Sequence, residues 1–217
     1  MRGMPKSVRR FRTLTQQLNR LKKQFIPKIN PLGSYSDRQL ALTLAYRVLV
    51  HAEIEAYFED RVWEVALNAK KNWDSQGKTC RTLICLLGFS GQMMEAPPDT
   101  LSPTKGSKAL PPEKIKVNKK IDLAINSFKR SIDDNHGIKE ANLLALLLPI
   151  GIDTDDLDPA WLATMNTFGE ERGVAAHTSA TSPKTIRSLN PINELRRVEQ
   201  IIQELSRVDE LIDNLMR

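Results

Sequence analysis

The chain has 217 residues and a net charge of +6, and only one of its interior regions is continuously apolar, which predicts one hydrophobic core. The longest apolar run, residues 143–150, is too short to span a bilayer, and the basic N-terminus lacks the apolar region of a signal peptide, so we expect a cytoplasmic protein without membrane contact. Cys80 and Cys85 have no ligand-like neighbours and predict free thiols, with no metal ion or other cofactor.

The first expected helix, over residues 5–26, carries much of the positive charge. Its apolar residues recur every three to four positions and a proline follows it, which predicts an amphipathic helix that packs one face against the rest of the chain. Residues 1–30 hold nine Lys or Arg and no acid, so we treat them as a basic N-terminal helix beside a domain over residues 36–217. The basic outer face either binds the phosphates of RNA or simply keeps the helix solvated. Its candidate RNA-binding residues are Arg9, Arg10, Arg12, Arg20 and Lys23.

The second expected helix is the longest element. Ser36 and Gln39 match a capping box, and no helix breaker follows until about residue 72. The apolar stripe of this helix also contains three polar residues, Arg47, His51 and Glu55. His51 and Glu55 are four residues apart and can pair with each other, while Glu55 can also meet an arginine of a neighbouring helix. This set either fixes the register of the helix or orients a functional arginine.

Three shorter helices are expected in the middle of the chain, over residues 79–87, 114–135 and 138–148. Between the first two, residues 90–113 contain five of the twelve prolines, which predicts a mobile Pro-rich insertion without packed structure. This insertion is either a lid over a substrate or disorder without function. Four aspartates follow in residues 153–158, but their spacing lacks the glycine and the terminal glutamate of a calcium loop, so we interpret them as a solvated turn.

The next expected helix begins at Asp158, a capping residue, and ends by about residue 179. One face of it carries, in order, Trp161, Met165, Phe168 and Arg172. An arginine within an apolar stripe needs a partner, because an unpaired buried charge is costly. His177 lies five residues further on and points away from Arg172. Two copies of the chain around a two-fold axis would bring both residues of both chains to one cleft.

The last expected helix covers residues 192–216. Its apolar residues approximate a 3.5-residue repeat that Asp209 interrupts. We expect this helix to pack mainly within the chain, with some contact across a dimer. No β-strand alternation, glycine-rich phosphate loop or Ser-His-Asp arrangement competes with the helical pattern, so the expected fold is an all-α bundle.

The segment Arg172-Gly-Val-Ala-Ala-His177 resembles the Arg-x4-6-His signature of the HEPN superfamily, whose all-helical domains often act as metal-independent ribonucleases. Upstream, Asn142-Leu-Leu-Ala-Leu-Leu-Leu, then Gly151-Ile152 and the acidic loop, look like the RiboL-PSP branch of that superfamily. Together with residues 57–59, the resemblance covers roughly residues 36–177. It implies a HEPN-like helical bundle that forms a homodimer and uses Arg172 and His177 as catalytic residues.

The resemblance also implies a reaction. His177 would move a proton at the ribose 2′-hydroxyl or at the leaving 5′-oxygen, and Arg172 would stabilise the charge on the phosphate, leaving 2′,3′-cyclic phosphate ends. The enzyme would be a toxin or a defence or stress ribonuclease, with RNA and an antitoxin or operon partner protein as its partners. Asn166 and Glu170 lie on the same side of the helix as His177 and either orient it or are ordinary surface residues.

Two alternatives stay open. Many family nucleases carry a polar residue directly after the arginine, where this chain has Gly173. This difference favours a non-catalytic HEPN-like module that binds RNA, a nucleotide or a partner protein. In the other alternative the chain is a helical interaction protein, and Arg172 and His177 have no role in chemistry.

Overall fold

The computed structural model describes residues 6–93, 116–177 and 189–217, and every regular element within these ranges is helical. In chain order the helices are α1 (Lys6–Phe25), α2 (Asp37–Gln76), α3 (Arg81–Phe89), α5 (Val117–Asp133), α6 (Glu140–Leu147), α7 (Pro159–His177) and α9 (Pro191–Asn214), with the 3-10 turn η1 (Thr154–Asp156) before α7. The expected all-α fold is therefore confirmed. None of the described helices is both long and apolar enough to cross a membrane.

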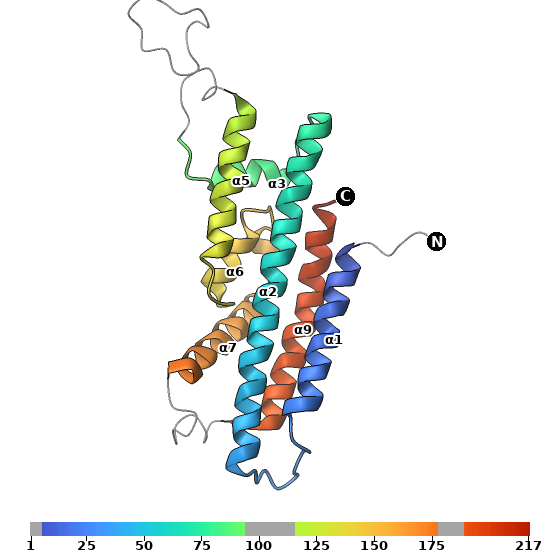
Figure 1. The fold of residues 1–217 in the computed structure, drawn as a ribbon, viewed down its shortest axis with the longest axis vertical. Coiled ribbons are helices and arrows are strands. Elements are labelled where there is room, and N and C mark those ends of the chain that lie inside the picture. The colour runs from blue at the N-terminus through green and yellow to red at the C-terminus, as the bar shows by residue number, and fades with distance from the viewer. Residues whose placement is uncertain (1–5, 94–115, 178–188) are drawn as a thin grey trace, which may run out of the picture.

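The long helix α2 forms the axis of the bundle, and most of the other helices pack along it (Figure 1). Its 40 residues begin at the expected capping box: the Ser36 hydroxyl accepts from the backbone N–H of Gln39, and the Gln39 side chain accepts from the N–H of Ser36. The helix ends at Gly77, whose left-handed φ of 63° lets its N–H donate to the carbonyl of Trp73. In Figure 1, α1 and α9 lie on one side of α2, and α5, α6 and α7 lie on the other.

One apolar core joins the helices, and the basic helix α1 is part of it. Leu14 and Leu18 of α1 are buried against α2 and α9 and belong to the same cluster as the core residues of α7. Burial of this face removes apolar surface from water, which stabilises the docked position of α1. The basic face of α1 therefore stays on the outside of the bundle.

Asp209, which was expected to interrupt the apolar repeat of the last helix, lies inside the bundle with 7% of its surface exposed. The buried Arg61 of α2 donates from Nε to the Asp209 carboxylate at 2.9 Å, and the Tyr57 hydroxyl donates to the same oxygen. Arg61 also forms ion pairs with Glu64 and Asp213. A buried carboxylate is tolerated here because a buried guanidinium neutralises it. Asp209 thus attaches α9 to α2 of its own chain.

The helix α7 crosses the loop before α6 at close range. A Cβ atom at Gly169 would lie 2.8 Å from Cγ and 3.4 Å from the backbone nitrogen of Lys139, so glycine permits this approach. The expected apolar face of α7 is buried, and α7 packs against α2, α6 and α9; the residues of this face are Trp161, Met165 and Phe168. These contacts fix the position of the second half of α7.

The expected helix boundaries agree with the structure to within about one helical turn. The Pro-rich insertion expected over residues 90–113 follows α3, and from residue 94 onward it lies outside the described residues. The same holds for residues 178–188, between α7 and α9.

Candidate active site

Arg172 and His177 both lie in α7, as expected. The helix begins where the Asp158 carboxylate accepts from the N–H of Ala160 at 2.8 Å, with proline at the first helical position. Arg172 is half-buried, and its Nε is buried without a hydrogen-bond partner among the described residues. The side chain of His177 lies outside the described residues, so only its backbone position, more than one turn beyond Arg172, is fixed.

The face of α7 that carries Arg172 meets Glu55 and His51 of α2. Burial is the largest influence on the pKa of both neighbours, and the positive charge of Arg172 adds to the fall in the pKa of His51 and opposes the rise in that of Glu55, so the three groups lie within electrostatic range of one another. Burial and the nearby Glu59 act more strongly on Glu55 and raise its pKa above the ordinary value. In the described part of the chain, Arg172 and Glu55 are neighbours without a direct ion pair. Arg172 therefore keeps unused hydrogen-bonding capacity beside a carboxyl group.

His51 is a buried, uncharged neighbour of this arginine. It is 1% exposed, and its ring stacks on Phe168 of α7 with centroids 6.2 Å apart. Burial, assisted by the charge of Arg172, lowers the pKa of His51 to about 4, so the imidazole is neutral near pH 7. Its Nδ1 lies 3.5 Å from the Glu55 carboxylate, which is too long for a good hydrogen bond. The expected His51 and Glu55 pair is thus a contact without charge neutralisation.

Arg47, the third polar residue of the α2 stripe, belongs to a buried ion-pair network directly beside Arg172. It donates from Nε to Glu194 of α9 at 3.0 Å and lies 2.9 Å from Glu171, the residue before Arg172. Arg197 of α9 contacts the same Glu171 carboxylate at 2.6 Å. Two guanidinium groups thus neutralise two carboxylates, and the network fixes the turn of α7 that carries Arg172 to both α2 and α9. Glu171, Glu194 and Arg197 were not identified from sequence.

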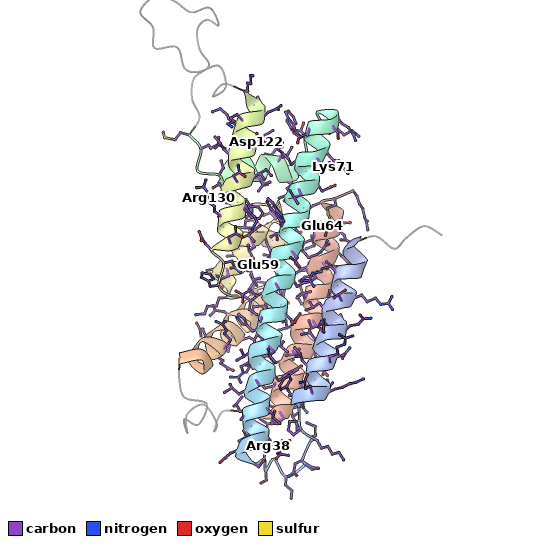
Figure 2. All side chains as sticks on the ribbon, in the orientation of Figure 1. Arg38, Glu59, Glu64, Lys71, Asp122 and Arg130 are labelled. Carbon is purple, nitrogen blue, oxygen red and sulfur yellow. The ribbon has the colours of Figure 1, made fainter. Side chains whose placement is uncertain are left out.

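A second polar chain runs from the middle of α2 into the loop before α6. Asn135 donates from Nδ2 to Glu59 at 2.8 Å, and Asn142 donates to the side-chain oxygen of Asn135 at 3.0 Å. Figure 2 labels Glu59 about halfway along α2. In the same loop, His136 offsets part of the rise in the pKa of Glu55 that burial and Glu59 cause. The acidic groups of mid-α2 therefore face this loop as well as α7.

Asn166 and Glu170, the candidates for orienting His177, bond to each other. The Asn166 amide donates to the Glu170 carboxylate at 3.0 Å, four residues further along α7. Glu170 is exposed and Asn166 is half-buried. Whether either residue contacts His177 falls outside what the described residues cover.

The candidate RNA-binding residues of α1 lie away from Arg172, because α1 and α7 are on opposite sides of α2 (Figure 1). Arg10 pairs with Asp60 of α2 at 2.6 Å, and Arg20 donates to Gln17 at 3.4 Å. Arg12 and Lys23 are exposed. The side chain of Arg9 lies outside the described residues. Within one chain, this basic face and the Arg172 region are separate surfaces.

Comparisons with known proteins identify one family. Among the described residues, no group of three or more His, Cys, Asp or Glu is placed to hold a metal ion. No curated protein and no solved structure matches the chain. The model of the RiboL-PSP-HEPN family matches residues 9–214, which extends the resemblance to most of α1 and to α9.

Proposed function

Since the chain belongs to the RiboL-PSP-HEPN family, we propose that it is a metal-independent endoribonuclease with Arg172 and His177 as its catalytic residues. The observation that carries the proposal is the state of Arg172, a half-buried arginine whose Nε has no hydrogen-bond partner among the described residues. A guanidinium whose Nε the described residues leave unbonded, carried on a packed helix, is suited to bind a phosphate.

In the proposed reaction, His177 takes the proton from a ribose 2′-hydroxyl, or gives one to the leaving 5′-oxygen. The 2′-oxygen forms a bond to phosphorus, the bond from phosphorus to the 5′-oxygen breaks, and the products carry a 2′,3′-cyclic phosphate and a 5′-hydroxyl. An imidazole with an ordinary pKa near neutrality serves in either role. Arg172 stabilises the negative charge that builds up on the phosphoryl oxygens.

The supporting residues of the proposal are on α2 and α7. Glu55 attracts the Arg172 guanidinium and directs it, His51 packs beside it in neutral form, and Asn166 with Glu170 orients His177. A homodimer about a two-fold axis would bring the α7 helices of two chains together, and light scattering at micromolar concentration tests for it. Further proposed partners are RNA on the basic face of α1 and an antitoxin or operon partner protein.

The second candidate function is an RNA-, nucleotide- or partner-binding module without catalysis, and Gly173 favours it. A Cβ atom at Gly173 would meet nothing within 4 Å among the described residues, so packing does not require glycine there. The position directly after Arg172 nevertheless offers no polar side chain to the reaction.

Incubation of the purified protein with mixed RNA in the presence of a chelator tests the proposal. The wild type should produce fragments with 2′,3′-cyclic phosphate ends, and Arg172→Ala and His177→Ala should each abolish them. Arg38→Ala, the loss of an exposed arginine at the start of α2, is the matched control and should cleave normally. If the folded wild type cleaves no RNA under any condition, the binding module takes the place of the nuclease.

The variant Arg172→Ala leaves Glu55 without its neighbouring positive charge, so a folding defect could imitate a catalytic one. The double variant with Glu55→Gln removes this complication. Restored folding without restored cleavage assigns Arg172 to the reaction, whereas restored cleavage assigns it to stability.

A further inference from the structure

A polar groove lies between α7 and α9, next to the turn that carries Arg172. Its volume is about 480 Å³, and none of its lining residues is acidic. From α7 it is lined by Ala163, Thr164 and Thr167, and from α9 by Asn193, Arg196, Arg197 and Gln200. Arg197 joins the groove to the candidate active site, because it contacts Glu171, the residue before Arg172, at 2.6 Å.

The groove contains donors that the described protein does not use. Arg196 is exposed and has no hydrogen bond or ion pair with any described residue, in contrast to Arg197. The side-chain amides of Asn193 and Gln200 are likewise exposed and without a partner in the described ranges. A guanidinium without an ion-pair partner can bind a phosphate, and two amides without partners can bind the sugar beside it.

The two threonines add acceptors. The hydroxyl of Thr164 donates to the carbonyl of Ala160 at 2.9 Å, and that of Thr167 donates to Ala163 at 3.0 Å. With their protons committed to the helix, both oxygens can only accept hydrogen bonds in the groove. The 2′-hydroxyl of ribose is a donor that deoxyribose lacks, so this lining favours RNA over DNA.

The charge differs between the two ends of the groove. Towards the start of α7 it continues into a second depression that shares Thr164 and Gln200 but is also lined by Asp158 and Glu204. Those carboxylates repel a phosphodiester, whereas Arg196 attracts one. A nucleic-acid strand is therefore held towards Arg196 and Arg197, at the end of the groove away from Asp158.

We propose that this groove binds the ribose-phosphate backbone of single-stranded RNA beside the scissile phosphate, with Arg196 on a phosphate and Thr167 accepting from a 2′-hydroxyl. The proposal rests on RNA as the ligand of the proposed function, and it does not depend on cleavage. It places RNA on a surface formed by α7 and α9, in addition to the basic face of α1.

Equilibrium binding of a fluorescent single-stranded RNA, measured by anisotropy over a series of salt concentrations, tests the groove. His177→Ala serves as the background so that cleavage does not disturb the measurement. Adding Arg196→Ala should weaken binding about tenfold and reduce the slope of log Kd against log salt by about one. Arg130→Ala removes another exposed arginine, from α5 (Figure 2), without a partner in the described residues, and should change neither quantity.

The DNA strand of the same sequence completes the test. It should bind more weakly than the RNA, and Thr167→Val should reduce this difference by weakening RNA binding alone. If Arg196→Ala changes RNA affinity no more than Arg130→Ala does, while the background protein still binds RNA, the groove is not the binding site and RNA binds to another surface. If Arg196→Ala weakens RNA binding but the wild type never cleaves RNA, the groove is an RNA-binding site and the proposed nuclease activity is wrong. If the protein binds no RNA at all, both the RNA-binding groove and the proposed ribonuclease activity are wrong.

Discussion

Replacement of Arg47 by methionine probes the buried network that fixes α7 to α2 and α9. Methionine keeps an unbranched apolar stem of similar reach, so the change removes the guanidinium and little of the packing. Arg47 is 3% exposed, and its main partner Glu194 is 2% exposed. The change therefore leaves a carboxylate inside the bundle without its closest cation.

The contacts of Arg47 determine how much stability this change should remove. Arg47 reaches both oxygens of Glu194, at 3.0 Å from Nε and 2.5 Å from Nη2, and breaking such a buried pair from one side costs about 3–5 kcal/mol. Arg197 remains 3.9 Å from Glu194 and compensates in part, so we expect a loss of about 3 kcal/mol. Lys22 and Glu199 also join two helices, at 3.2 Å, but both are well exposed, and Lys22→Ala should cost less than about 1 kcal/mol.

Urea unfolding followed by circular dichroism measures both changes, with an unchanged m-value as evidence that the transition stays two-state. The double variant Arg47→Met with Glu194→Gln should recover part of the loss, because a neutral amide replaces the stranded charge. A loss of stability from Arg47→Met no larger than that from Lys22→Ala would contradict the role of the buried ion pair, and so would a further loss of stability on adding Glu194→Gln.

Further predictions concern two glycines and a histidine. Gly173→Ala should raise the free energy of unfolding by about 0.5–1 kcal/mol, because alanine favours the helix and its Cβ would meet no atom of the described residues within 4 Å. Gly169→Ala should lower the free energy of unfolding through the clash at 2.8 Å. Thermal melting of both variants tests this difference, and equal shifts would contradict the close approach at Gly169. Burial lowers the pKa of His51 to about 4 in the folded protein, so unfolding takes up a proton below the ordinary value of 6.5. The contribution of neutral His51 to the free energy of unfolding should thus be fully present above pH 6.5. It should decrease by up to about 3 kcal/mol as the pH falls towards 4. His51→Gln should lose this part of the pH dependence in unfolding experiments at pH 5 and pH 7.5; an unchanged dependence would exclude His51 as its source.

The sequence predicted those parts of the fold that depend on neighbouring residues. The capping box at Ser36 is read from residues three apart, and the apolar face of α7 follows from helical periodicity, so both were found. The resemblance at Arg172 and His177 identified the family, although the roles of these residues stay proposals.

The partners of the buried charges could not be predicted, because they come from distant parts of the chain. Arg47 was identified as a polar residue on an apolar stripe, but Glu171 and Glu194 are more than a hundred residues away and look like ordinary surface acids. Asp209 was interpreted as an interruption for the same reason, because its partner Arg61 was not recognised in the sequence as a buried residue of α2.

The two buried arginines of α2 also fix the register between α2 and α9. Arg47 pairs with Glu194 and Arg61 pairs with Asp209, so two points on one helix are matched to two points on the other. Apolar stripes alone tolerate a slip by one turn, since leucine and valine replace each other in a core, but such a slip would unpair both arginines at once. One residue inserted into α9 between these acids would rotate the second acid by about 100° away from its arginine. The spacing of the two acids is therefore under a stricter constraint than the identity of the apolar residues between them, and this part of α9 can change its composition far more readily than its length.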